Sequence, residues 1–252
     1  MRTIVLVLAA LYSTLSWSQV VLQSLPPDTP DNCPKRSEMM SRWLEDWPNL
    51  SRYRSADEQL SALKSTESRV VFLGDSITDS WDLAKYFGSK PYVNRGISAQ
   101  TTPQMLLRFH QDVVALQPRV VVILAGTNDI AGNTGPLSTT EIENNYSSMA
   151  DIAHANRISV VFSSILPVNN YTPSSQHFFA ERSMEKIREL NTWLKHYAAQ
   201  HGDVYLDYFS PMLDEKGLLR RDLAEDGLHP NDKGYRLMVP LAEEAITEAS
   251  KP

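Results

Sequence analysis

Short apolar runs that alternate with longer amphipathic stretches, from about residue 69 to the end of the chain, constrain its fold most. One run, Val120–Leu124, is apolar throughout, which is typical of a strand buried on both faces. Residues 101–116 instead carry apolar side chains at spacings of three and four, the pattern of an amphipathic helix. Repeated strand and helix segments of this kind predict an α/β domain built on a parallel sheet.

The expected architecture is a three-layer α/β/α sandwich around a five-stranded parallel sheet. Its strands are predicted at Val70–Leu73, Tyr92–Asn94, Val120–Leu124, Ser159–Ser163 and Val204–Leu206. Its main helices are predicted at residues 101–116, 140–156, 179–200 and 231–249. Thr140 and Glu143 have the spacing of a capping box, and Asn231 or Asp232 is the expected N-cap of the last helix. The pattern alone does not fix the order of the strands.

The first 18 residues have the features of a cleaved secretory signal peptide. Arg2 precedes the apolar stretch Ile4–Leu11, and the small residues Ser16 and Ser18 follow it. This stretch is too short to cross a bilayer comfortably, although a retained anchor or an amphipathic extension is an alternative interpretation. We therefore expect export to the periplasm or the medium, with cleavage near Ser18 and no membrane span afterwards.

Residues 19–65 are expected to form a leader and an accessory helical region, and residues 66–252 a single domain. Three prolines between positions 26 and 30 favour an irregular start. Helical spacing then runs from Met39 to Trp47, and Pro48 is expected to end or kink that helix. The length of 252 residues suits one domain with a full-sized core.

The acidic net charge argues against a nucleic-acid-binding protein. The chain has 24 Lys and Arg against 30 Asp and Glu, a net charge of −6, without a basic cluster. Because binding of nucleic acid depends on neutralising phosphates, a small-molecule partner is expected instead. Cys33 is the only cysteine, so no internal disulfide can form.

Two short motifs, one near each end of the predicted domain, carry the groups of a nucleophilic catalyst. Ser76 lies in Gly-Asp-Ser directly after the first strand, and Asp226 and His229 lie in Asp-Gly-Leu-His near the carboxyl terminus. A hydroxyl needs a base to become a good nucleophile, and an imidazole is a reliable base when a carboxylate fixes its tautomer. These three residues could supply the three roles.

Two further motifs lie between them and bring groups that can stabilise an oxyanion. Gly96, in Asn-Arg-Gly-Ile, permits close approach of the backbone to a ligand. Asn128, in Ala-Gly-Thr-Asn-Asp, follows the strand Val120–Leu124 and should emerge at its carboxyl end. Open α/β sheets bind their ligands at that edge.

With these four motifs in this order, the chain resembles the SGNH or GDSL hydrolases, a family of esterases and lipases, over about residues 69–250. The resemblance implies a flavodoxin-like strand order, 2-1-3-4-5. It also implies Ser76 as nucleophile, His229 as general base and Asp226 as its orienting carboxylate. The Ser76 and Gly96 amides and the Asn128 carboxamide would form the oxyanion hole. The wider motifs are similar to the platelet-activating-factor acetylhydrolase and lysophospholipase branch, which implies short acyl groups.

The function expected from the sequence is that of an exported serine esterase that uses neither a metal nor a cofactor. One alternative is a carbohydrate O-acetyl esterase with the same triad, and another is a non-catalytic binding protein on this scaffold. A metal site assembled from Asp75, Asp129, Asp226 and His229 is a third, although no dense cluster of ligands supports it.

The substrate pocket is the least specified part of the prediction. Trp81, Ile97, Ile130 and a predicted loop at residues 168–179, which includes His177, are candidates to contact substrate. Ordinary core packing is the alternative for the apolar ones. Asp75 is expected to point away from the substrate and to accept hydrogen bonds from nearby loop amides.

Overall fold

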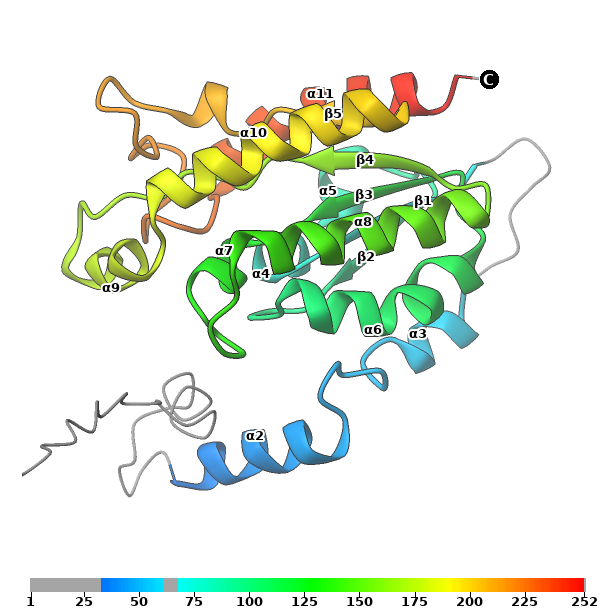
Figure 1. The fold of residues 1–252 in the computed structure, drawn as a ribbon, viewed down its shortest axis with the longest axis horizontal. Helices are drawn as coiled ribbons and strands as arrows, with labels where there is room; N and C mark the ends of the chain where they lie inside the picture. Colours follow the sequence, from blue (N-terminus) through cyan, green and yellow to red (C-terminus); the bar gives the residue numbers. More distant parts are fainter. Residues whose placement is uncertain (1–32, 61–67, 252) are drawn as a thin grey trace, which may run out of the picture.

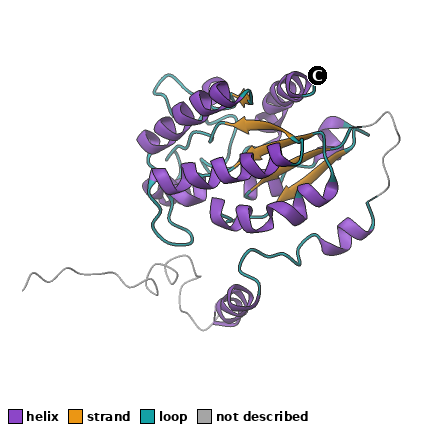
Figure 2. Ribbon diagram, turned by 45° about the vertical axis from the view of Figure 1, so that its right-hand side comes forward, coloured by secondary structure: helices purple, strands orange, loops and turns teal. Residues whose placement is uncertain are grey.

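The structure, a computed structural model, describes residues 33–60 and 68–251. The predicted signal peptide, residues 1–18, and most of the predicted leader lie outside the described residues. Figure 1 shows the arrangement of the elements, and Figure 2 shows helices on both sides of a central sheet.

The sheet has five parallel strands in the order β2-β1-β3-β4-β5, which confirms the predicted fold and strand order. The strands are β1 Val70–Gly74, β2 Tyr92–Gly96, β3 Val120–Leu124, β4 Ser159–Ser163 and β5 Val204–Leu206. β2 extends two residues beyond the prediction because Arg95 and Gly96 remain in register with Leu73 and Gly74 of β1. The central strands β1 and β3 are buried at every position, as their uninterrupted apolar sequences indicate.

The helices differ in length, from single turns to five turns. They are α2 Cys33–Glu45, α3 Arg54–Glu58, α4 Ser76–Asp79, α5 Leu83–Phe87, α6 Thr102–Asp112, α7 Thr127–Ile130, α8 Thr139–Ala155, α9 Pro173–Glu181, α10 Met184–His201 and α11 Asp232–Ala249. Short 3-10 turns, η1 Val114–Leu116 and η2 Ser210–Met212, follow α6 and β5. In the part of the chain that the structure describes, no helix combines the length and apolar character needed to cross a bilayer.

Two predictions about helix boundaries were wrong. The capping box of α8 uses Ser138 and Glu141, not Thr140 and Glu143, because the extended backbone of Ser138 lets its side chain accept the Glu141 amide. The segment before residue 179, expected to be a loop, contains α9. Thr172 caps this helix and Pro173 occupies its first turn, where a missing N–H has no cost.

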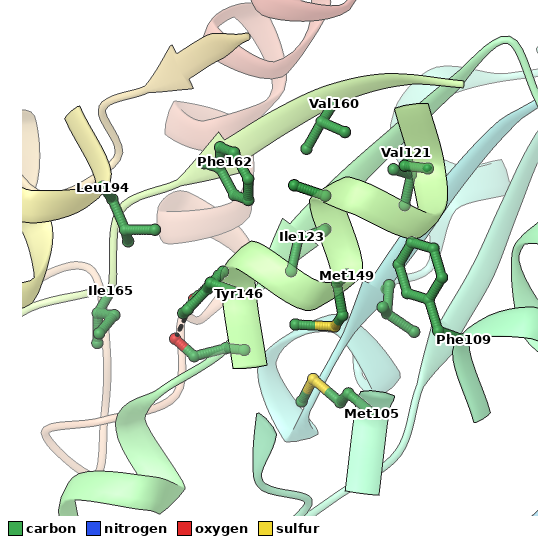
Figure 3. Packing of buried hydrophobic residues seen from close by; sticks show 14 of the residues in the cluster. Met105, Phe109, Val121, Ile123, Tyr146, Met149, Val160, Phe162, Ile165 and Leu194 are labelled. Atoms are coloured by element: carbon green, nitrogen blue, oxygen red, sulfur yellow. Dashed lines mark hydrogen bonds between the residues drawn. The ribbon is translucent and has the colours of Figure 1, made fainter. Parts of the chain in front are cut away.

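Two apolar clusters hold helices against opposite faces of the sheet. α6, α8 and α10 pack on one face, where Met105, Met149 and Leu194 are fully buried (Figure 3). In this cluster the Tyr146 hydroxyl donates to the carbonyl of Ala125, 2.9 Å away, just beyond the end of β3. This bond ties α8 to the start of the loop that carries Asn128.

The other face is covered by α4, α5 and α11, and its cluster is rich in aromatic rings. The Trp81 ring stacks on Tyr235 of α11 at 5.3 Å between centroids and meets Phe72 of β1 edge-on at 5.6 Å. The Tyr235 hydroxyl also donates to the carbonyl of Ile77 in α4. Large buried rings of this kind contribute much of the apolar area removed from water. They fix α4, which begins with Ser76.

The accessory region packs its carboxyl-terminal part against the domain. Gln104 of α6 donates to the carbonyl of Trp47 at 2.8 Å, and Gln100 donates to the carbonyl of Pro48 at 2.7 Å. The Tyr53 hydroxyl donates to the carbonyl of Gly96. The predicted accessory helix is present as α2; it ends before Pro48 and lies away from the sheet in Figure 1.

Candidate active site

The four motifs converge because the strands that precede three of them are neighbours in the sheet. The parallel register aligns Gly74 of β1 with Gly96 of β2 on one side and with Leu124 of β3 on the other. The loops after these three strands therefore start at the same edge of the sheet. In Figure 1, α7 and α9 lie at this edge, toward which the strand arrows point.

Ser76 is the first residue of the single-turn helix α4, and Asp75 is its N-cap. The Ser76 hydroxyl oxygen lies 2.9 Å from Nε2 of His229, across 153 positions of sequence. Among the described residues, the Ser76 amide donates to no protein group. The hydroxyl therefore has a base within reach, and the adjacent N–H is free to bind a ligand atom.

His229 is held on its other side by Asp226. Its Nδ1 lies 2.6 Å from Oδ2 of Asp226, and Oδ1 of the same carboxylate accepts the His229 and Leu228 amides at 2.8 and 3.0 Å. The turn between them needs Gly227, which has a φ of +82°, and a Cβ there would lie 2.2 Å from the carbonyl of Asn169. The carboxylate thus directs the Nδ1 proton toward itself and leaves Nε2 facing Ser76.

The pKa of Asp226 supports an ionised carboxylate in this position. Burial alone would raise its pKa, but hydrogen bonds from the His229 ring and from the His229 and Leu228 amides outweigh burial, so the pKa lies below its ordinary value. At neutral pH Asp226 is therefore negative and can stabilise an imidazolium at His229.

Asn128 presents a buried carboxamide at the same edge. It is the second residue of α7, which begins after Gly126, a residue with a φ of +101°. Nδ2 of Asn128 donates one hydrogen to the carbonyl of Gln100 at 3.0 Å, and Oδ1 accepts from Nη2 of Arg182 at 3.2 Å. An amide nitrogen has two hydrogens, so one remains to donate to a ligand.

The oxyanion role predicted for Gly96 is wrong. Its amide already donates to Oδ1 of Asn94 at 2.8 Å and is not free. The glycine is required for packing instead, because a Cβ at this position would lie 2.0 Å from the backbone nitrogen of Asp79 in α4. Gly96 allows α4 to approach β2 closely.

Ala99, three residues further on, has the properties that Gly96 lacks. Its φ is +68°, in the left-handed region, and among the described residues its amide donates to no protein group. Its carbonyl accepts from Nδ2 of Asn133, and the next carbonyl, that of Gln100, accepts from Asn128. These bonds place the Ala99 backbone beside the Asn128 carboxamide. Sequence reasoning missed Ala99 because alanine rarely adopts this conformation.

Comparison with known proteins identifies the family. Residues 72–237, about two thirds of the chain, match the GDSL-like lipase/acylhydrolase family. The chain belongs to that family. The resemblance predicted from the four motifs is confirmed, and so is the class of enzyme, an ester hydrolase.

Several solved structures resemble this GDSL-like acylhydrolase. A candidate acylhydrolase from Bacteroides fragilis is 38% identical, covers 82% of this chain and 99% of its own, and gives a TM-score of 0.75. A GDSL-like lipase from Bacteroides thetaiotaomicron is 37% identical, with coverages of 81% and 100% and a TM-score of 0.74. A Streptococcus pneumoniae protein described as a candidate platelet activating factor is 27% identical, with coverages of 82% and 98% and a TM-score of 0.68. The comparison with curated proteins gave no match.

Two buried carboxyl groups of this acylhydrolase, Asp75 and Asp129, lie beside the motifs. Burial raises the pKa of each to about 6, against opposing hydrogen bonds from Ile77 and Thr102 respectively. Asp75 accepts the Ile77 amide at 3.0 Å, as predicted, while its other oxygen has no hydrogen-bond partner among the described residues. Asp129 accepts the amide and hydroxyl of Thr102 and so joins α7 to α6.

Two of the acidic groups in the metal-site alternative already have other partners. In residues 33–60 and 68–251, no group of three or more His, Cys, Asp or Glu side chains is arranged to hold a metal ion. Asp226 is already bound to His229, and Asp129 to Thr102. The geometry gives no support to the metal-dependent alternative.

Most of the residues predicted to contact substrate are packed in the protein core. Trp81 is only 2% exposed within the aromatic cluster, so that prediction is wrong, and Ile97 is buried as well. Ile130 is half-buried against the core. The His177 side chain is 71% exposed on α9, where it pairs with Glu181.

Phe178, the residue after His177, is the aromatic side chain that meets the predicted triad. Its ring lies edge-on to the His229 ring, with 5.9 Å between centroids. It lies in the segment 168–179, which was predicted to be a loop and a candidate for the substrate pocket but contains α9. The Thr-Pro start signal at residues 172–173 could have indicated the helix that positions it.

Proposed function

We propose that this chain is a serine esterase in which Ser76 is the nucleophile, His229 the general base and acid, and Asp226 the orienting carboxylate. The observation that carries the proposal is the continuous relay from the Ser76 hydroxyl through both ring nitrogens of His229 to Asp226. Such a relay activates a hydroxyl without a metal or a cofactor.

The reaction follows from this geometry. The Ser76 oxygen attacks the ester carbonyl carbon while Nε2 of His229 takes the hydroxyl proton. The tetrahedral intermediate then collapses, and His229 returns the proton to the departing alcohol. His229 then takes a proton from water, which attacks the acyl-enzyme carbonyl; the carboxylic acid leaves, and His229 returns the proton to the Ser76 oxygen.

The proposed oxyanion hole has three donors: the Ser76 amide, the Ala99 amide and Nδ2 of Asn128. The first two are free of protein partners among the described residues, and the third has one hydrogen left. Three donors around one oxygen suit the negative charge that develops in the transition state. Ala99 replaces Gly96, which sequence analysis had assigned.

We further propose that the enzyme is exported and acts on short acyl groups. Export is supported by the basic residue, apolar stretch and small residues of positions 1–18. Short acyl groups are supported by the motifs shared with the platelet-activating-factor acetylhydrolase branch. The ring of Phe178 also places a bulky group against His229, the proposed general base.

The test compares p-nitrophenyl acetate, butyrate and octanoate as substrates of the wild type and of Ser76→Ala. We expect acetate to give the highest kcat/KM, and Ser76→Ala to lose at least about 10³-fold in kcat. Ser80→Ala, at the exposed end of the same helix, is the matched control and should keep wild-type activity.

Other outcomes would contradict the proposal. Activity that survives in Ser76→Ala but disappears in EDTA would favour metal-dependent hydrolysis instead.

A second assay with acetylated xylo-oligosaccharides and short-chain lysophospholipid esters separates a carbohydrate esterase from a lipid esterase. An acetyl-xylooligosaccharide esterase from Geobacillus shares the fold with a TM-score of 0.57 at 20% identity.

Export has its own test. Expression of the full chain in a secreting host, followed by mass spectrometry of the exported protein, should show an amino terminus near residue 19. A product that stays with the cell membrane and keeps residues 1–18 would indicate a retained anchor.

A further inference from the structure

We propose that Arg182 is a positioning residue for Asn128: it fixes the carboxamide so that its free N–H faces the oxyanion, and it thereby couples helix α9 to the oxyanion hole. The proposal rests on the role of Asn128 as an oxyanion donor in the proposed function. Arg182 itself is not assigned any contact with substrate.

The contacts of Arg182 are unusual for an arginine at the end of a short helix. The residue is only 4% exposed. Its Nε donates to the Thr127 hydroxyl at 3.1 Å and its Nη2 donates to Oδ1 of Asn128 at 3.2 Å. Thr127 and Asn128 are the first two residues of α7, so one planar guanidinium grips the start of that helix at two points.

The grip matters because a carboxamide has two ends of nearly equal size. If Asn128 turned over, its oxygen would face the developing negative charge and repel it. Two opposite requirements prevent this: the Gln100 carbonyl needs a donor, and the Arg182 guanidinium needs an acceptor. Only one orientation satisfies both.

The charge of Arg182 adds a second effect. A guanidinium bound to Oδ1 draws electron density toward the oxygen of the amide, which makes the Nδ2 hydrogens stronger donors. This polarisation acts on the oxyanion through Asn128, while the charge of the buried Arg182 also acts on the Asp75 and Asp226 carboxylates.

Arg182 also connects the oxyanion hole to the general base. It follows directly after α9, and its Nη1 donates to the carbonyl of Phe178 at 3.4 Å and pairs with Glu181 at 3.3 Å. The ring of Phe178 in turn meets the ring of His229. A movement of α9 would therefore change the positions of the Asn128 carboxamide and the His229 ring together.

A double-mutant cycle with p-nitrophenyl acetate tests the proposal. We expect Asn128→Ala to lower kcat by about 10²- to 10³-fold, the usual effect of losing one oxyanion donor. Arg182→Met should lower kcat by about 10- to 100-fold with little change in KM, since the donor is misplaced but not removed. The double variant should have nearly the kcat of Asn128→Ala alone, because Arg182 has nothing left to position.

The outcomes separate this inference from the proposed function. If the two single losses multiply in the double variant, or if Arg182→Met keeps wild-type kcat, Arg182 does not act through Asn128 and the inference is wrong. If Asn128→Ala itself keeps wild-type kcat, the oxyanion hole assigned above is wrong.

Two further variants control for charge and folding. Glu181→Gln removes the acidic partner of Arg182 but leaves its contacts with α7, and should keep kcat within about twofold of the wild type. Arg182→Lys keeps the charge but cannot bind Thr127 and Asn128 together, and should fall between wild type and Arg182→Met. Should Arg182→Met not fold, as judged by circular dichroism, Arg182→Lys takes its place in the cycle with the same criterion.

Discussion

Two buried arginines approach the active-site edge of the sheet from different helices, and they do different work. Arg108, in α6, is fully buried and donates to the Gly74 and Arg95 carbonyls at 3.0 and 2.8 Å. Arg182, after α9, binds the side chains of Thr127 and Asn128. Arg108 holds the ends of strands β1 and β2, and Arg182 holds two side chains at the start of α7.

Their charge partners differ in the same way. Arg108 pairs with Asp112 one turn along its own helix, and the two side chains are 0% and 1% exposed. Arg182 pairs with Glu181, whose side chain is 38% exposed on a short helix. Arg108 and its buried partner Asp112 therefore stabilise the fold, whereas Arg182 has the proposed role of positioning Asn128.

The largest effect on stability is expected for substitution of Arg108. Arg108→Met should lower the free energy of unfolding by about 3–5 kcal/mol, because it leaves Asp112 buried without its counter-charge. Urea denaturation at pH 7 measures this loss. Arg108→Met combined with Asp112→Leu should recover part of it, and a single-variant loss below about 1 kcal/mol would show that the pair does not brace the fold.

A second test uses the pH dependence of stability at Asp75. Burial raises its pKa to about 6, while Arg182 is one of the charges that act in the opposite direction. A raised pKa means that the folded state holds the proton more tightly, so stability is lost as pH rises from about 4 to about 6. A shift of about two units corresponds to about 3 kcal/mol.

The measurement is urea denaturation of the wild type and of Asp75→Asn at several values between pH 4 and pH 7. Asp75→Asn should reduce the fall in stability across this window, with the fall from Asp129 remaining. Arg182→Met should extend the fall to higher pH, because it removes a nearby positive charge. Identical pH profiles for the wild type and Asp75→Asn would contradict the assignment to Asp75.

Arg182→Met should cost less stability than Arg108→Met at pH 7. We expect about 1–2 kcal/mol, since it leaves two buried acceptors without a donor, whereas its acidic partner Glu181 is already partly exposed to water. The free energies of unfolding of the two variants, measured side by side, decide the matter. Equal losses of unfolding free energy in Arg182→Met and Arg108→Met would show that the two arginines contribute equally to stability.

The smallest effect is expected at Ala99, in the loop that Arg108 holds through Gln100. Because Ala99 has a φ of +68°, Ala99→Gly should raise the free energy of unfolding by about 0.5–1 kcal/mol and keep kcat/KM near the wild type. Thermal denaturation and the p-nitrophenyl acetate assay measure both. A destabilised Ala99→Gly would show that the loop is not strained at this position.

The sequence predicted the parts of this enzyme that depend on local pattern. The β3 strand follows from an unbroken apolar run, and Asn231, which caps the last helix, was one of two cap candidates chosen by residue type and place. The strand order and the proximity of Ser76 to His229 came from the family resemblance, because they join parts of the chain 153 positions apart.

The parts that were missed depend on contacts without a local pattern. Ala99 is distinguished by a backbone angle that its residue type disfavours, and Gly96 attracted the oxyanion role because glycine is the usual signal for close approach. Arg182 lies 54 positions from Asn128 and precedes no motif. Buried hydrogen bonds between distant side chains are specified by the packed structure, not by spacing.

The family match begins at residue 72, yet three backbone carbonyls upstream of it accept hydrogen bonds from Gln100 and from two glutamines of α6. Trp47, Pro48 and Leu50 receive the side-chain amides of Gln104, Gln100 and Gln111. A shortened protein that starts at the family boundary would strip these glutamines of their partners and loosen the loop beside Asn128. A shortened version of this enzyme for crystallisation or engineering should therefore keep the segment from Asp46 onward, because that segment supplies these three acceptors.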